Sequence, residues 1–131
     1  MKNILFICIE NSCRSQMAEA FAIIHGRGLV NAHSAGSMPS GIVNEKAIMA
    51  MQKIGYDLSL HQSKSIDEFS GEKFDMVVTM GCGDACPNIQ SIHNIDWNIP
   101  DPKKMNLDDF INVRNMIEIK VKRLLEDIEK K

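Results

Sequence analysis

Short apolar runs and amphipathic segments alternate along the chain. Residues 2–8 form an apolar run rich in strand-forming residues, and they lack the alternation of a half-exposed strand, which predicts a buried central strand. From Arg14 onward, apolar residues recur at helical spacing as far as Gly26, and this pattern predicts an amphipathic helix. Two more strands are expected, over residues 30–35 and over residues 75–80.

Two further helices are predicted between and after these strands. The first of these helices is capped by Asn44 and ends before Gly55. Its expected inner face consists of Ala47, Ile48, Met51 and Ile54. Asn106 caps the C-terminal helix, whose expected inner face consists of Phe110, Val113, Ile117, Val121, Leu124 and Ile128. Strands that alternate with helices imply right-handed parallel βαβ units in an α/β fold, with the functional site at the carboxyl ends of the strands.

Composition restricts the class of protein. A chain of 131 residues is long enough for one domain, which we place over residues 1–131. The balance of 15 Lys+Arg against 17 Asp+Glu provides no basic surface for nucleic acid. The apolar run over residues 4–9 is too short to span a membrane and lacks a cleavage-type tail, so we expect an unprocessed, cytoplasmic protein without membrane contact. At this size a monomer is expected.

Four cysteines, at positions 8, 13, 82 and 86, carry the candidate chemistry. Structural disulfides are not expected in a chain that has no export signal and enough residues for an apolar core. Metal binding and thiol chemistry therefore remain as the two explanations.

The first candidate site is the segment that joins the first strand to the first helix. It reads Cys8, Ile9, Glu10, Asn11, Ser12, Cys13, Arg14 and Ser15. Its backbone N–H groups can converge on a tetrahedral anion, the helix N-terminus adds positive potential, and Arg14 can supply a bidentate fork. The same field favours the thiolate of Cys8, which would face the central atom of the anion as a nucleophile. Ser15 can donate a hydrogen bond to this thiolate, and Asn11 can shape the loop through a left-handed backbone.

Both cysteines of this loop also have a plain structural explanation. A cysteine at the end of a strand is often only a small buried residue, but the setting of Cys8 and the position of Arg14 favour the nucleophile. Cys13 has no evident partner in the sequence, so we expect it to be structural.

The second candidate site is the segment Gly81 to Pro87, which follows the third strand and contains Cys82 and Cys86. These thiols could form a disulfide if the segment turns, since the Cα atoms of an unstrained disulfide lie about 5.5 Å apart. The alternative is a zinc site. Its further ligands would be Cys8, Cys13 or a histidine such as His93, but no second close pair of ligands has the spacing of a structural zinc site.

Asp101 is the best candidate for a proton donor to an oxygen leaving group. It precedes Pro102 in a long loop that also contains Trp97. Since Asp-Pro is also a common turn opening, this assignment depends on the other candidate residues. The histidines are expected at the surface or behind the site, without a catalytic role.

Together these motifs resemble the thioredoxin-coupled arsenate reductases, which share the fold of the low-molecular-weight protein tyrosine phosphatases. The motifs are Cys8 to Ser15, Ser34-Ala35-Gly36, the pair Cys82 and Cys86, and Asp101-Pro102. The resemblance covers essentially the whole chain and implies a three-layer α/β sandwich with a four-stranded parallel sheet. By position, it implies that Cys8 attacks arsenate held by the loop amides and Arg14, while Asp101 protonates the departing oxygen.

The resemblance also implies a role for the distal cysteines. Cys82 would attack Cys8 and release arsenite, and Cys86 would then attack Cys82, which moves the disulfide to a surface where thioredoxin can reduce it. Reduction of arsenic(V) to arsenic(III) needs two electrons, and two thiols that become one disulfide provide them. This scheme requires no cofactor and no metal.

The chain departs from the family pattern in three ways that concern the site. Cys82 and Cys86 are only four positions apart, closer than in the best-known members. Ile9 and Glu10 stand where the family often has a small residue and a glycine, and Glu10 places a negative charge beside the anion site, which is expected to slow binding. Some family members bind potassium through residues at four positions. Three of these positions match Asn11, Glu19 and Ser34 of this chain. Lys64 stands at the fourth, where those members have an aspartate, so we expect no potassium dependence, and an ammonium can take the place of the ion.

Two other functions remain open at this point. A phosphotyrosine phosphatase would use the same Cys8, Arg14 and Asp101, but should present aromatic walls beside the acid, and the chain has one Trp and one Tyr. A weak phosphatase side activity is expected in either case. The third hypothesis is a noncatalytic protein that binds a metal or arsenite through its thiols.

Overall fold

The computed structural model describes residues 1–81 and 89–130 of the chain. Its elements are β1 (Lys2–Cys8), α1 (Arg14–His25), β2 (Val30–Gly36), α2 (Glu45–Gln52), η1 (Leu58–Leu60), η2 (Ile66–Phe69), β3 (Lys73–Thr79), β4 (Gln90–Asp96) and α3 (Leu107–Glu129), where η marks a 3-10 helix. All three strands expected from the sequence are present. No helix in these residues is long and apolar enough to cross a membrane.

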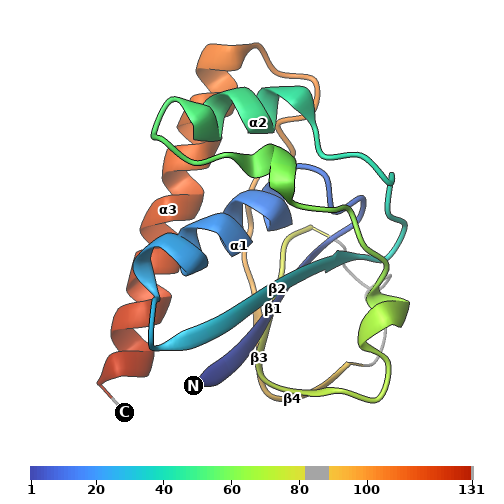
Figure 1. Cartoon of the computed structure of the whole chain (residues 1–131), viewed down its shortest axis with the longest axis vertical. Coiled ribbons are helices and arrows are strands. Elements are labelled where there is room, and N and C mark those ends of the chain that lie inside the picture. Colours follow the sequence, from blue (N-terminus) through green and yellow to red (C-terminus); the bar gives the residue numbers. More distant parts are fainter. Residues whose placement is uncertain (82–88, 131) are drawn as a thin grey trace.

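The four strands of the described residues form one parallel sheet in the order β2-β1-β3-β4 (Figure 1). The central strand β1 pairs with both neighbours, so that Cys8 lies opposite Gly36 of β2 and Ile7 lies opposite Thr79 of β3. The carboxyl ends of these three strands therefore meet at one edge of the sheet, which is where open α/β sheets bind ligands. The predicted four-stranded parallel sheet is confirmed.

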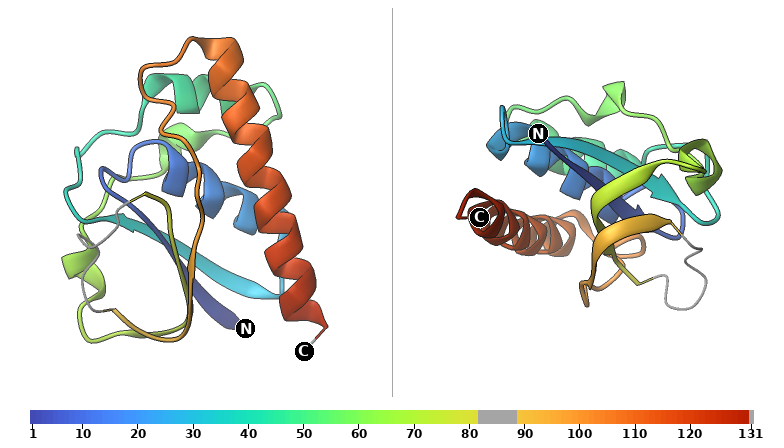
Figure 2. Two further views of the ribbon diagram at one scale, coloured as in Figure 1. Left: turned by 180° about the vertical axis from the view of Figure 1, so that it is seen from behind. Right: turned by 90° about the horizontal axis from the view of Figure 1, so that it is seen from below.

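Each face of the sheet carries its own apolar core. Helices α1 and α3 lie together on one face, and α2 packs beside them (Figure 2). The core on this face includes Ile4, Phe6, Phe21, Val78, Phe110 and Ile117. The core on the other face consists of Leu5, Ile7, Ala35, Ile66, Phe69, Phe74 and Val77. Successive residues of β1 thus point to opposite faces, so β1 is buried on both sides and holds Cys8 in a fixed position.

Two details of the elements differ from the sequence-based expectation. The prediction that Ile54 faces inward is wrong, because α2 ends at Gln52 and the side chain of Ile54 is 45% exposed. The hydrophobic pattern also did not reveal β4. It is an edge strand whose residues are mostly polar and exposed, so it lacks the apolar run by which a buried strand is recognised.

Candidate active site

The loop between β1 and α1 forms a cup whose donors are backbone N–H groups. Four of its carbonyl groups point away from the cup, because each accepts a hydrogen bond from the segment 37–44. The pairs are Ser37 N to Cys8 O (3.3 Å), Met38 N to Ile9 O (2.8 Å), Ser40 N to Glu10 O (3.0 Å) and Asn44 N to Ser12 O (3.0 Å). The N–H groups of residues 9–13 donate no hydrogen bond to any described residue. These donors are therefore available for an anion.

Arg14, the first residue of α1, reaches across the cup toward Asp101. Its guanidinium is buried, with Nη1 donating to the Ile99 carbonyl at 3.0 Å and Nη2 lying 3.8 Å from Asp101 Oδ2. Cys13, at the N-cap position of α1, also lines the cup, so the positive end of this helix lies beside it. The structure therefore brings Cys8, Arg14 and Asp101 around one cavity of about 60 Å³.

Cys8 lies at the floor of this cup and contacts Ser15. The cysteine is 3% exposed, and its Sγ atom lies 2.9 Å from Ser15 Oγ. The side chain of Asn11 donates from Nδ2 to the same Ser15 oxygen at 2.8 Å. Because that oxygen already accepts a hydrogen bond from Asn11, the single hydroxyl proton of Ser15 is free to be donated to the sulfur. This bond holds the sulfur in place at the floor of the cup.

Asn11 shapes the loop in the way its residue type predicts. Its φ angle is 51°, and no other non-glycine residue in residues 1–81 or 89–130 has a positive φ. Its Oδ1 atom accepts hydrogen bonds from the Lys64 backbone at 2.7 Å and from Gln16 Nε2 at 3.0 Å. Asparagine tolerates the left-handed region better than other L residues, and here its fully buried amide also ties the loop to two neighbouring segments.

Two glycines leave room for the loop and for Arg14. A Cβ atom at Gly36 would lie 2.6 Å from the Ile9 carbonyl oxygen, so a larger residue would push the loop outward. Gly81 has a φ angle of 81°, and a Cβ atom there would overlap Nη1 of Arg14. Both positions therefore favour glycine, because a side chain there would displace the loop or the Arg14 guanidinium.

Cys13 lines the cup but is not activated. Burial raises the pKa of its thiol to about 11, and the contact with the Ser12 hydroxyl at 3.6 Å offsets this only in part. A thiol with such a pKa stays protonated at neutral pH and is a poor nucleophile. This agrees with the structural role expected from the sequence.

The carboxylate of Glu10, at the rim of the cup, forms an ion pair with Lys103. Lys103 Nζ lies 2.9 Å from one of its carboxylate oxygens and 2.8 Å from the other. The sequence reveals only the negative charge of Glu10, since nothing in it relates this residue to a lysine 93 positions later. The structure shows that this charge is paired.

A polar network that the sequence pattern does not reveal lies behind the loop. Gln16 is fully buried, and its Nε2 atom donates to the carbonyl oxygens of Asn11 at 3.0 Å and Gln62 at 2.8 Å. Its Oε1 atom lies 3.0 Å from Nδ1 of His61, and Nε2 of His61 lies 2.6 Å from the Tyr56 hydroxyl. A glutamine at a fully buried helix position is the one signal that could have suggested such a role.

The residues matched to potassium ligands lie in the same network. Glu19 accepts a hydrogen bond from Ser34 Oγ at 2.5 Å, and its Oε1 atom lies 3.5 Å from His61 Nδ1. Burial, together with the charge of Glu19, raises the pKa of Tyr56. In the part of the chain that the structure describes, Lys64 contributes its backbone N–H to Asn11 and makes no ion pair with Glu19. His61, and not the Lys64 ammonium, is the side chain at ion-pair distance from Glu19.

The distal cysteines Cys82 and Cys86 lie outside the described residues. The zinc hypothesis depends on both of them. Among the residues that the structure does describe, no three His, Cys, Asp or Glu side chains are placed to hold a metal. His93 pairs with Met76, which pairs with Ile4, so it lies well below the carboxyl edge and is not brought to Cys8.

The aromatic residues do not reach the cup. Its described lining consists of Cys8, Ile9, Glu10, Ser12, Cys13, Arg14 and Asp101. The ring of Trp97 is buried against Phe6, with ring centres 5.9 Å apart, and Tyr56 contacts His61. The aromatic walls expected of a phosphotyrosine phosphatase are therefore absent from this lining.

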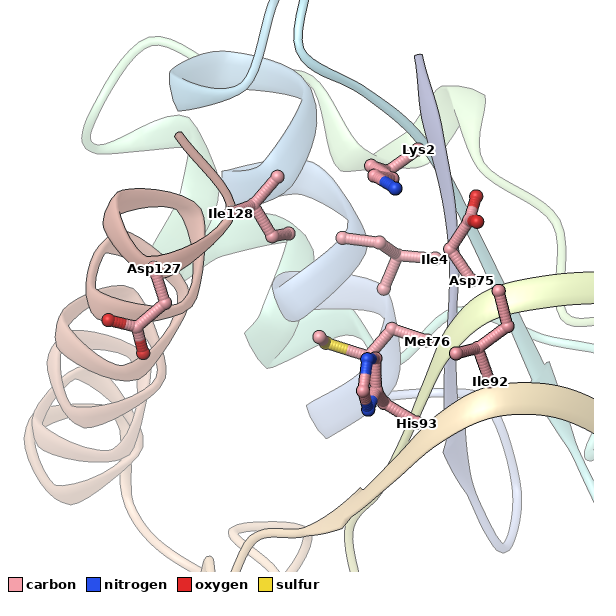
Figure 3. Close-up of a pocket in the computed structure, with 8 residues that line it drawn as sticks. All are labelled: Lys2, Ile4, Asp75, Met76, Ile92, His93, Asp127 and Ile128. Carbon is pink, nitrogen blue, oxygen red and sulfur yellow. The ribbon is translucent and has the colours of Figure 1, made fainter. Parts of the chain in front are cut away.

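A different cavity, of about 100 Å³, opens between β1, β3, β4 and the end of α3 (Figure 3). Its walls are mainly apolar and include Ile4, Met76 and Ile128. Asp75 at its rim already accepts a hydrogen bond from the Asn3 backbone at 2.7 Å. None of the residues around Cys8 lines this cavity, so it is separate from the candidate site.

Comparison with known proteins agrees with this geometry. Residues 3–131 match the family described as "Low molecular weight phosphotyrosine protein phosphatase". The "Glutaredoxin arsenate reductase" of Synechocystis sp. is 37% identical, over 98% of this chain and 99% of that protein. A solved structure of "An arsenate reductase in the phosphate binding state" superimposes with a TM-score of 0.85 at 36% identity, over 98% of this chain and 99% of that one. A "thioredoxin-dependent arsenate reductase" of Corynebacterium glutamicum superimposes with a TM-score of 0.81 at 27% identity, over 98% of this chain and 62% of that one.

Proposed function

This chain belongs to the low molecular weight phosphotyrosine protein phosphatase family, and on that premise we propose that it reduces arsenate to arsenite through a relay of three cysteines. One observation above all supports a reaction at a tetrahedral oxyanion: backbone N–H groups without a described acceptor surround a buried cysteine whose sulfur is hydrogen-bonded to Ser15. The named arsenate reductases among its relatives support arsenate as the oxyanion.

In the first step the Cys8 thiolate attacks arsenic. The loop residues Ile9 to Cys13 bind the arsenate oxygens through their amides, and Arg14 binds two of them through its planar fork. A sulfur–arsenic bond forms as an arsenic–oxygen bond breaks, and Asp101 gives its proton to the departing hydroxyl, which leaves as water. The Asp101 carboxyl is half exposed and lies on the rim beside Arg14, so it can take up a new proton from solvent.

In the next steps two electrons pass from sulfur to arsenic. The Cys82 thiolate attacks the Cys8 sulfur, which forms a disulfide, breaks the sulfur–arsenic bond and leaves the electron pair on arsenic as arsenite. Cys86 then attacks Cys82, so that the disulfide moves to the pair Cys82 and Cys86 and Cys8 is released as a thiolate. A dithiol protein returns both cysteines to the reduced state. We assign thioredoxin to this step, with glutaredoxin as the alternative that the Synechocystis relative suggests.

The relay has a consequence for where the protein works. It starts from reduced thiols, which the cytoplasm maintains and an oxidising compartment does not. A cytoplasmic location is therefore part of the proposal.

The direct test is arsenate-dependent NADPH oxidation with thioredoxin and thioredoxin reductase. Wild type should turn over, and Cys82→Ser should not, because it lacks the thiol that completes the two-electron transfer. A Cys86→Ser variant treated with arsenate should accumulate the disulfide between Cys8 and Cys82, which peptide mass spectrometry identifies. Turnover that persists in Cys82→Ser would reject the relay, and substitution of glutaredoxin for thioredoxin would identify the reductant.

A phosphatase is the second candidate, because the cup binds tetrahedral anions without distinguishing arsenic from phosphorus. Hydrolysis of p-nitrophenyl phosphate should be weak, since the described lining offers no aromatic side chain to an aryl group. Hydrolysis that is efficient and unaffected by Cys82→Ser, together with no arsenate turnover, would make the protein a phosphatase.

A further inference from the structure

An ion pair at the rim of the cup joins the anion loop to the segment that carries Asp101. Lys103 Nζ binds both carboxylate oxygens of Glu10, at 2.9 and 2.8 Å. Glu10 lines the cup together with Cys8 and Arg14, so its charge lies within reach of any anion bound there. The pair is therefore part of the electrostatic surroundings of the site, although the reaction steps described above do not use it.

The backbone fixes both partners of this pair. The carbonyl oxygen of Glu10 accepts hydrogen bonds from the Ser40 backbone and from the Ser63 hydroxyl, each at 3.0 Å. On the other side, the Lys103 backbone N–H donates to Asp101 Oδ1 at 3.1 Å, which turns the chain after Asp101 back toward the cup. The ammonium and the carboxylate are thus held near each other by two separate parts of the fold.

The charges around the cup explain what the pair can do. Two carboxylates, Glu10 and Asp101, stand at the rim, and arsenate itself is an anion. Arg14 lies beside Asp101 inside the cup, which leaves Lys103 as the cation that contacts Glu10. The hydrogen bond and the charge of Glu10 also raise the pKa of Lys103, so the ammonium stays charged through the neutral range.

We propose that Lys103 is a positioning residue that neutralises Glu10 and thereby allows an oxyanion to enter and stay in a cup whose rim would otherwise repel it. This inference rests on the proposed oxyanion site and adds to it a residue that determines affinity for the anion. The role is electrostatic and not a matter of stability, because the two side chains are 49% and 31% exposed and exposed ion pairs stabilise folding little.

The test is a double-mutant cycle with inorganic phosphate as the probe, because phosphate has the same shape and charge as arsenate and cannot be reduced by thiols. The dissociation constant of phosphate is measured by calorimetry at low ionic strength for wild type, Lys103→Met, Glu10→Gln and the double variant. Lys104→Met is the matched control. It removes the same charge next to Lys103, and Lys104 makes no ion pair with any described residue.

Lys103→Met should weaken phosphate binding about five- to ten-fold, because the Glu10 charge is then unpaired beside the anion. The double variant should return to within about two-fold of wild type, since removal of both charges restores the balance at the rim. Lys104→Met should change binding less than about two-fold, and higher ionic strength should reduce the deficit of Lys103→Met. In the arsenate assay the same pattern should appear in KM, with kcat unchanged.

Two results would overturn the inference. If the double variant binds as weakly as Lys103→Met, Lys103 acts on the anion directly and not through Glu10. If Lys103→Met binds phosphate as wild type does, the pair has no role at the site. Because phosphate binding needs no arsenate turnover, a wild type that binds phosphate and fails to reduce arsenate would reject the proposed function alone and leave this test intact.

Discussion

Replacement of Ser15 by alanine removes the hydrogen bond to the Cys8 sulfur and also removes the acceptor of the Asn11 amide, 2.8 Å away. Ser15 is fully buried, and its hydroxyl lies 2.9 Å from Cys8 Sγ. The hydroxyl proton is directed to the sulfur because the Asn11 amide already donates to the Ser15 oxygen. A hydrogen bond to a charged group contributes about 1.5 to 3 kcal/mol. Loss of this bond should therefore lower the rate of Cys8 alkylation at neutral pH roughly 10- to 100-fold.

The assay is timed alkylation by iodoacetamide of the fully reduced protein. Cys8 and Cys13 lie in one tryptic peptide, residues 3–14, so tandem mass spectrometry is needed to assign the label to either. Cys13 serves as an internal reference, because burial raises its pKa to about 11 and it should react slowly in every variant. The matched control is Ser12→Ala, since the Ser12 hydroxyl lies 3.6 Å from Cys13 Sγ and makes no contact with Cys8.

Equal alkylation of Cys8 in wild type and Ser15→Ala would refute the argument that this hydroxyl activates the Cys8 sulfur. An equal loss of rate in Ser12→Ala would also contradict it, because the effect would then come from general disturbance of the loop. Arsenate turnover should fall along with alkylation in Ser15→Ala.

Three further predictions concern the loop and its surroundings. Asn11→Ala should lower the free energy of unfolding by about 3 kcal/mol, because a left-handed backbone costs roughly 1 kcal/mol without a suitable side chain and the partly buried Lys64 N–H loses its acceptor; a urea midpoint equal to that of wild type would contradict this. The Cys13 pKa is raised from 9.0 to about 11, so protonated Cys13 contributes stability that is complete below pH 9 and lost as the pH rises to about 11. This contribution to stability is about 2 kcal/mol. The difference in free energy of unfolding between wild type and Cys13→Ala, measured in urea, should shrink by that amount from pH 8 to pH 11. A constant difference would disprove the raised pKa of Cys13. Gly81→Ala should displace the Arg14 guanidinium and raise KM for arsenate about ten-fold or more, and an unchanged KM would show that the guanidinium does not bind the anion.

Local signals in the sequence were sufficient to predict the loop between β1 and α1. The apolar run of β1, the helical pattern from Arg14 and the turn between them are contiguous, and a strand followed at once by a helix can only place its loop at the carboxyl edge of the sheet. Cys8, Arg14 and Ser15 could therefore be assigned to one cup from their order along the chain, and the left-handed backbone of Asn11 follows from its residue type.

Contacts between distant segments were decided only by the tertiary structure. Lys103 meets Glu10 across 93 positions, and His61 meets Gln16 across 45, because the edge of the sheet and the turn after Asp101 bring these segments together. β4 has no apolar run of its own and exists as a strand because the exposed edge of β3 offers it hydrogen bonds. A single sequence records the spacing of apolar residues and the turn residues, which govern the local backbone conformation. It does not record which exposed charges the packed elements bring together, because that choice depends on the geometry of the whole sheet.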